Sequence, residues 1–178
     1  SEVYRLRDMV HEFFIREFEL WSTTDVDAVM FMDDWGTQQA LLISPEMWRE
    51  FFKPLYRDYV SIAHSKKKFV FMHSDGMIEA IYPDLIEIGV DALNSQLFCM
   101  DIERLGREFG GKITFWGEID RQRLLPFAAA DEVSAGVRRV VTALGNFNGG
   151  LIAQCEWGSD VRSVNVRAVF ETFCEMGD

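Results

Sequence analysis

The sequence predicts an α/β fold with a parallel sheet, and three observations lead to this class. Five short apolar segments alternate with segments of helical spacing, and such alternation implies parallel strands joined by right-handed crossovers. Each apolar segment stops abruptly at polar side chains, which is where α/β proteins place their chemistry. No G-x-G-x-x-G motif or P-loop follows a strand, so neither kind of nucleotide-binding domain is indicated.

Length and composition suit one domain over residues 1–178. The chain is 48% hydrophobic and 26% charged, with a formal net charge of −11. This acidic balance argues against binding to nucleic acid or to an anionic membrane surface, since both need clustered lysine and arginine. Cys99, Cys155 and Cys174 are widely spaced, which indicates free thiols in a reducing compartment. No targeting segment or membrane-spanning apolar run is seen, so we expect a soluble, cytoplasmic protein.

The first half of the chain is expected to begin with a helix and to contain two strands. Residues 2–21 show a broad apolar stripe at helical spacing, and residues 28–32 form an apolar run that Asp33 stops. Ser44 and Pro45 suit the N-cap and first position of a helix that runs in two pieces to about residue 65. Residues 69–73 then read as a strand buried on both faces. The methionines within these strands are expected in the core: Met30, Met32 and Met72.

The second half continues the alternation through three further strands. A helical segment from residue 77 to about 89 precedes a short strand over 91–94, and a short helix covers 101–109. Gly110-Gly111 breaks that helix before a strand over 112–116. A helix from 130 to about 144, a strand over 151–154 introduced by Gly149-Gly150, and a helix from about 164 to 176 complete the chain.

Polar residues recur at all five predicted strand ends. In chain order they are Asp33 and Asp34, His73 and Asp75, Asn94 and Gln96, Glu118 and Asp120, and Gln154 and Cys155. In a (β/α)8 barrel such ends form one rim. Five strands are too few to close a barrel, so the chain forms either an open sheet or the C-terminal part of a longer barrel.

Imidazole, carboxylate and thiolate at this rim suggest a metal site. His73, Glu118 and Cys155 offer ligand types that zinc accepts, and three protein ligands with one open position are the pattern of catalytic zinc. Asp75 is expected either to be a further ligand or to orient His73 as an outer residue that does not bind the metal itself. Each of these residues also has an ordinary structural reading, such as a histidine bonded to a neighbouring carbonyl or a buried free cysteine.

The other rim residues are candidates for acid–base chemistry and for contact with substrate. Carboxylates at the rim could exchange protons or bind a cationic or pyrrolic N–H group, although Asp33-Asp34 could equally be a turn or cap. The four carboxylates expected to be catalytic are Asp33, Asp34, Asp75 and Glu118. Tryptophans at strand ends could line a pocket for a flat ligand or simply pack. The residues expected to contact substrate are Trp35, Gln38, Asn94, Gln96, Trp116 and Gln154.

Several segments together resemble the uroporphyrinogen decarboxylase superfamily, over nearly the whole chain. They are Asp33-Asp-Trp-Gly-Thr-Gln-Gln39, Ile43-Ser-Pro-Glu-Met-Trp-Arg-Glu-Phe-Phe-Lys-Pro54, His73-Ser-Asp-Gly76, Pro83-Asp-Leu-Ile-Glu-Ile-Gly-Val-Asp-Ala-Leu-Asn94, Phe115-Trp-Gly-Glu-Ile-Asp120 and Gly149-Gly-Leu-Ile-Ala-Gln-Cys155. The resemblance implies the C-terminal part of a (β/α)8 barrel. In motif the chain is most similar to the cobalamin-dependent methyltransferases of the superfamily.

In those methyltransferases a zinc is held by the histidine of an H-x-C-G motif and by a cysteine after the last strand. His73 and Cys155 match these positions, whereas Asp75 replaces the middle cysteine and leaves itself or Glu118 to complete the site. The resemblance implies that zinc activates a thiol-like acceptor or a methyl donor for exchange with a corrinoid. The implied partner is a corrinoid protein or a tetrapyrrole-like small molecule.

Two alternatives remain open from the sequence. The decarboxylases act without metal in porphyrin biosynthesis, bind an acidic tetrapyrrole, and carry an L-G-H-G-like turn after the last strand. The comparable turn here, Cys155-Glu-Trp-Gly158, lacks the histidine, which argues against that activity. The chain could also be a truncated, non-catalytic module. Because a half barrel exposes apolar faces and sheet edges, we expect a homodimer or a missing N-terminal half.

Overall fold

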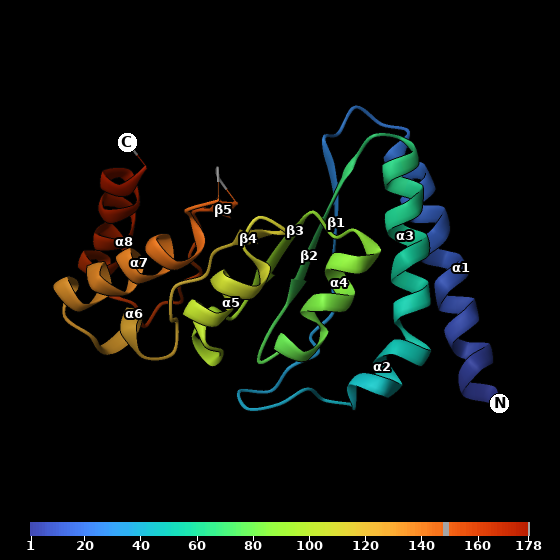
Figure 1. The fold of residues 1–178 in the computed structure, drawn as a ribbon, viewed down its shortest axis with the longest axis horizontal. Coiled ribbons are helices and arrows are strands. Elements are labelled where there is room, and N and C mark those ends of the chain that lie inside the picture. The colour runs from blue at the N-terminus through green and yellow to red at the C-terminus, as the bar shows by residue number, and fades with distance from the viewer. Residues whose placement is uncertain (148–149, 178) are drawn as a thin grey trace.

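In the computed structural model of this chain, residues 1–147 and 150–177 are described. Five parallel strands form one sheet in the order β1-β2-β3-β4-β5 (Figure 1). Their bounds are Ala28–Met32, Phe69–Ser74, Ala92–Ser95, Thr114–Trp116 and Leu151–Ile152. The expected α/β class is therefore confirmed, with the last two strands shorter than expected. Gly149, expected just before the last strand, lies outside the described residues.

Helices connect every pair of successive strands. The α-helices are α1 Glu2–Ser22, α2 Pro45–Phe51, α3 Lys53–Ser65, α4 Tyr82–Ile88, α5 Ile102–Phe109, α6 Leu124–Phe127, α7 Ala130–Leu144 and α8 Ser163–Met176. Two 3-10 turns, η1 Glu79–Ile81 and η2 Leu97–Cys99, precede α4 and α5. The helix expected over residues 77 to about 89 is therefore a 3-10 turn followed by the α-helix α4. The short helix α6 was not expected.

The local sequence explains where several helices begin and end. The Ser44 side chain accepts a hydrogen bond from the Met47 N–H at 3.1 Å, so α2 has the N-cap that the sequence predicts. Asp101 caps α5 in the same way, accepting from the Arg104 N–H at 2.8 Å. Gly89 ends α4 with a φ of 96°, a left-handed conformation that favours glycine.

Side chains of the first two strands alternate between a helix-covered face and an open face. In β2, Val70 and Met72 are fully buried, whereas Phe69 is 58% exposed. The expectation that this strand is buried on both faces is therefore wrong. Met30 and Met32 of β1 are 45% and 63% exposed, so of the three strand methionines only Met72 lies in the core. The reason is that, within the described part of the chain, no element covers the second face at this end of the sheet.

The strand register places one row of residues side by side across the sheet. Met32 pairs with His73, His73 with Asn94, Asn94 with Trp116, and Trp116 with Ile152. Residues paired in parallel strands point to the same face of the sheet. The row therefore brings His73, Asn94 and Trp116 together on the open face, next to the carboxyl ends of the strands.

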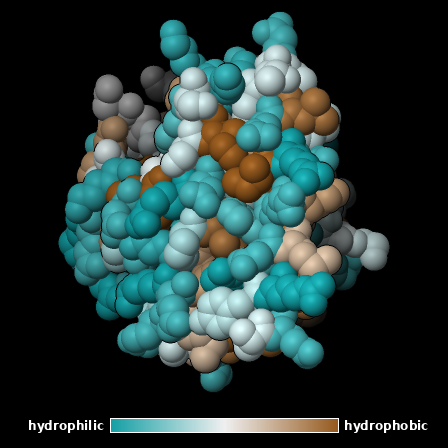
Figure 2. All heavy atoms as spheres, turned by 90° about the vertical axis from the view of Figure 1, so that its right-hand side faces the viewer, coloured by the Kyte–Doolittle hydropathy of each residue, from teal (hydrophilic) through white to brown (hydrophobic). Residues whose placement is uncertain are grey.

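An apolar groove of about 620 Å³ lies at the β1 end of the molecule, between α1, α3 and β1. We call its exposed hydrophobic lining the α1 face: Val3, Leu6, Val10, Phe13, Phe14, Trp21, Met30 and Met32. Figure 2 shows hydrophobic side chains grouped among polar ones on this side of the molecule. None of the described helices is long and apolar enough to cross a membrane.

Candidate functional site

The loops that follow β1 and β2 are joined backbone to backbone. The Gly36 N–H donates to the Asp75 carbonyl at 3.0 Å, and the Met77 N–H donates to the Thr37 carbonyl at 2.7 Å. A Cβ on Gly76 would lie 2.2 Å from the Gly36 carbonyl oxygen, and the φ of Gly76 is +79°. Both glycines are therefore required by the close approach, and the contact sets the spacing of the side chains in the two loops.

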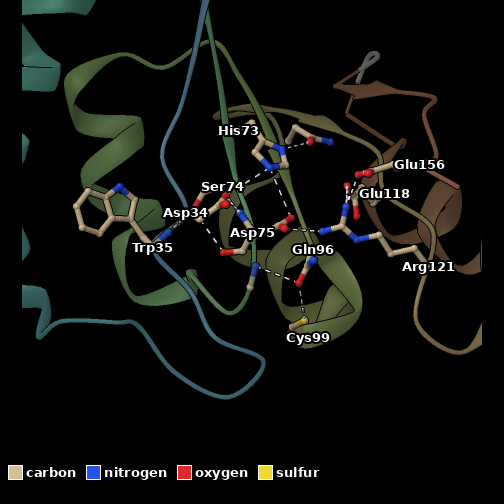
Figure 3. Close-up of polar contacts among 12 residues, drawn as sticks. Asp34, Trp35, His73, Ser74, Asp75, Gln96, Cys99, Glu118, Arg121 and Glu156 are labelled. Atoms are coloured by element: carbon tan, nitrogen blue, oxygen red, sulfur yellow. Dashed lines mark hydrogen bonds and ion pairs between the residues drawn. The ribbon is translucent and has the colours of Figure 1, made fainter. Parts of the chain in front are cut away.

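His73 is the centre of the polar cluster between these loops (Figure 3). Its Nδ1 contacts the Asn94 side-chain oxygen, and its Nε2 faces Oδ1 of Asp34 and Oδ1 of Asp75, each at 3.5 Å. Within the described ranges, Asp34, His73 and Asp75 form the one His/Cys/Asp/Glu group whose ligand atoms all lie within 4.8 Å of one another. Such a group can hold a metal ion.

Arg121 connects this cluster to the loop after β4. Its Nη2 donates to Asp75 Oδ2 at 2.5 Å, and its Nη1 contacts Glu156 and lies 4.0 Å from Glu118 Oε1. Glu118 is 3% exposed, and burial raises its pKa to about 7 against the opposing effect of Arg121. Asp75 Oδ1 and Glu118 Oε1 are both buried without a hydrogen-bond partner. Glu118 can therefore hold or release a proton near neutral pH.

Cys155 lies apart from the group around His73. It is 8% exposed, and burial, followed by the nearby Glu118 charge, raises the pKa of its thiol to about 11. β3 and β4 lie between β2 and β5, and within the described residues the Cys155 sulfur does not belong to a group whose ligand atoms all lie within 4.8 Å of one another. The structure brings His73 together with Asp34 and Asp75, and the ligand set His73, Glu118 and Cys155 stays a prediction.

Asp33 and Trp35 point away from His73 towards the helices. Asp33 Oδ2 accepts a hydrogen bond from the Tyr56 hydroxyl at 2.5 Å, and the Trp35 indole N–H donates to the same hydroxyl at 2.9 Å. The Trp35 ring packs against Phe52, and Figure 3 shows it on the side away from the cluster. Burial raises the pKa of Asp33, with the Tyr56 hydrogen bond opposing it. Of the adjacent pair, Asp34 is thus the residue that faces the histidine.

A second polar feature lies beside the cluster, in a cleft of about 240 Å³ that Glu118 and Arg121 also line. Gln38 donates to Gln96 Oε1 at 2.8 Å, and the Cys99 thiol donates to Gln38 Oε1 at 3.0 Å. We call this the amide cleft. Two of the residues expected to contact substrate, Gln38 and Gln96, therefore lie together in a cavity large enough for a small polar ligand.

Three other residues that were expected to contact substrate lie on the side of His73 that carries Nδ1. The Asn94 side-chain N–H groups donate to the Trp116 carbonyl at 2.6 Å and to Gln154 Oε1 at 3.4 Å. The Trp116 ring packs against Phe71 on the same face of the sheet. Asn94 thus contacts His73 on the side away from the two carboxylates, and Trp116 and Gln154 accept hydrogen bonds from Asn94.

The sequence model of the family described as uroporphyrinogen decarboxylase (URO-D) matches residues 1–176. The chain belongs to this family. No curated protein sequence matches the chain. Among solved structures, a methyltransferase from Methanosarcina mazei is similar in fold, with a TM-score of 0.74 and 18% sequence identity. The likeness covers 96% of this chain and 48% of the methyltransferase chain, so the URO-D chain described here spans about half the length of that neighbour.

Membership of the URO-D family confirms the resemblance predicted from the sequence, and the fold likeness confirms the partial barrel. Arg121 and Tyr56 are among the residues near the candidate site that were not expected. Arg121 could have been noticed as the cation that follows Glu118 and Asp120 in the loop after β4. Tyr56, which holds Asp33, had no such signal because it lies in the middle of α3.

Proposed function

We propose that this chain is part of a metal-dependent methyltransferase of the URO-D superfamily, acting between a corrinoid and a small acceptor such as a thiol. The observation that carries the proposal is the His73 imidazole, whose Nε2 faces two carboxylate oxygens at 3.5 Å. This donor set suits a divalent cation, which the decarboxylase branch does not use. The fold likeness to a protein named as a methyltransferase adds support.

The residues at the strand ends fit zinc by their chemistry. Zinc accepts imidazole, carboxylate and thiolate ligands, and Asp75 Oδ1 is a buried oxygen with no hydrogen bond of its own. His73 would be the central ligand, and Asp75 would be one of the carboxylates that complete the site. When bound, zinc would lower the pKa of an acceptor thiol and keep it nucleophilic at neutral pH.

The other site residues have roles that follow from their surroundings. Glu118, with a pKa of about 7, could take up the proton that an acceptor thiol loses and return it later. Arg121 fixes the Asp75 carboxylate through the hydrogen bond to Oδ2. The amide groups of Gln38 and Gln96 could bind the polar part of a small acceptor in the amide cleft.

The test is methyl transfer from methylcobalamin to a panel of small thiols, using protein expressed from its complete gene. We expect transfer that needs a divalent metal and is lost in His73→Ala. The matched control is His64→Ala, because His64 pairs with Asp91 at the opposite ends of the strands. Conversion of uroporphyrinogen without metal would assign the chain to the decarboxylase alternative, and cobalamin binding without transfer would indicate a non-catalytic module.

The exposed apolar side chains of the α1 face suit a surface that another part of a protein covers. We propose that a second copy of the chain, or the remaining strands of a barrel, covers the apolar groove beside β1. Edge strands with exposed apolar side chains are normally paired or covered, and the chain spans 48% of its structural neighbour. Sedimentation of the purified 178-residue chain should show a dimer or larger species. A stable and active monomer would contradict the proposal.

A further inference from the structure

We propose that Asp34, His73 and Asp75 together form the divalent-cation site, and that Cys155 is not a ligand. The inference rests on the proposed function for the role of the cation, whereas the ligand set is argued from the geometry alone. Asp34 becomes a ligand although the resemblance assigns it no part in metal binding. The site then differs from a thiolate site in the metals it selects.

The surroundings of Asn94 fix the orientation of the histidine. The Asn94 side-chain NH2 donates to the Trp116 main-chain carbonyl at 2.6 Å, and a carbonyl can only accept. The Asn94 oxygen must therefore face His73 Nδ1, and this oxygen is also only an acceptor. Nδ1 consequently carries the hydrogen. In the neutral imidazole the Nε2 lone pair is left pointing at the two carboxylates.

Three acceptor atoms then face one another with no hydrogen between them. They are His73 Nε2, Asp34 Oδ1 and Asp75 Oδ1, with 3.5 Å from the nitrogen to each oxygen. Such an arrangement is repulsive unless a positive charge lies among the three atoms. Ligands of a tetrahedral zinc are about 3.4 Å apart when the metal–ligand distance is ~2.1 Å. The two nitrogen–oxygen distances therefore suit a bound cation, and all three atoms lie within 4.8 Å of one another. A proton on Nε2 is the competing explanation.

Both carboxylate ligands are held by contacts outside the metal site. Arg121 donates to Asp75 Oδ2 at 2.5 Å, which leaves Oδ1 buried and without a hydrogen bond. The Asp75 main-chain N–H donates to Asp34 Oδ1 at 2.9 Å, and a carboxylate oxygen has a second lone pair for a metal. Metal sites commonly orient their ligands through such outer contacts. Behind Arg121, the almost fully buried Glu118 also has an oxygen without a partner.

The ligand set indicates the class of cation. One imidazole and two carboxylates suit first-row divalent ions such as Mn²⁺, Fe²⁺, Co²⁺ and Zn²⁺, whereas thiolate-rich sites select softer metals. The Asp34 side chain is 62% exposed, so a bound cation would keep positions open to water or to a small ligand.

The test is metal binding by protein expressed from its complete gene and stripped with a chelator. Zn²⁺ and Co²⁺ are titrated into the wild type and into Asp34→Asn, Asp75→Asn and Cys155→Ser. We expect both asparagine variants to lose more affinity than the roughly 10–100-fold that loss of an outer contact costs, and Cys155→Ser to bind as the wild type does. The Co²⁺ complex should lack the near-ultraviolet charge-transfer band of a cobalt–thiolate bond. Asp34→Asn changes one atom of an exposed side chain and should leave the fold intact. A loss of metal affinity in this variant therefore reports a loss of metal binding and not a loss of folding.

Several outcomes would overturn the inference. They are a cobalt–thiolate band, a loss of affinity in Cys155→Ser, unchanged affinity in Asp34→Asn, or no metal binding, which would leave protonated His73 as the explanation. A different result would refute the proposed function and leave the ligand set standing. Metal binding that depends on Asp34 and Asp75, in a protein that transfers no methyl group, would support the ligand set and refute the methyltransferase.

Discussion

Replacing Glu118 by glutamine should stabilise the metal-free protein at alkaline pH and have little effect in acid. Glu118 is 3% exposed, and burial raises its pKa to about 7 from an ordinary value of 4.5. Between these two values the folded protein holds a proton that the unfolded chain releases. The free energy of unfolding therefore falls as the pH rises through this range, and the stabilising contribution is fully present only below the lower value.

The size of the effect follows from the shift. At about 1.4 kcal/mol per pKa unit, the change from 4.5 to about 7 corresponds to about 3 kcal/mol over the whole range. Roughly 2 kcal/mol of this falls between about pH 5.5 and pH 8. Glutamine resembles the neutral carboxyl and does not titrate, so the variant should lack this loss of stability.

The assay is urea unfolding of the wild type and Glu118→Gln at several pH values, with a chelator present throughout. The difference in unfolding free energy between the two proteins should grow by about 2 kcal/mol in favour of the variant as the pH rises from about 5.5 to 8. Parallel pH profiles for the two proteins would show that Glu118 is not held neutral by burial.

Three further predictions concern stability and reactivity. Gly76→Ala should destabilise the protein by at least about 2 kcal/mol more than Gly111→Ala in urea unfolding, because both glycines have a positive φ but only Gly76 also meets a backbone atom at 2.2 Å. Asp84→Asn should cost about 3 kcal/mol in the same assay, because Asp84 is 5% exposed and binds an arginine and a lysine at 2.9 and 2.7 Å. Iodoacetamide should label exposed Cys174 before Cys155, whose pKa is about 11, as peptide mass spectrometry would show; equal rates would contradict the burial of Cys155.

The sequence predicted the strands well because their signals are local. β1 begins and ends at the expected residues, since an apolar run stops at two aspartates. Burial of the strand faces was less predictable. An apolar run does not show which neighbours are present, and Met30 and Met32 are exposed because no described element covers their side of the sheet.

The candidate site was predicted in its residues but not in their grouping. Asp34, His73 and Asp75 were all expected at the rim, and their closeness follows from β1 and β2 being neighbours in the sheet. The sequence could not show that Tyr56 would bind Asp33 and so leave Asp34 to face the histidine. It also could not give the distance of Cys155 from His73, because that depends on the two strands between them and on the curvature of the sheet.

The contact between Gly36 and Gly76 has a consequence for how this edge of the sheet can change over evolutionary time. Because backbone atoms hold the two loops together, the main-chain position of residue 75 does not depend on its own side chain. Relatives could therefore exchange the carboxylate for a thiol at this position without rebuilding the loops, whereas the Asp34 side chain itself bonds to the second loop. One scaffold could in this way pass between different metals, and between chemistries with and without metal, through single substitutions.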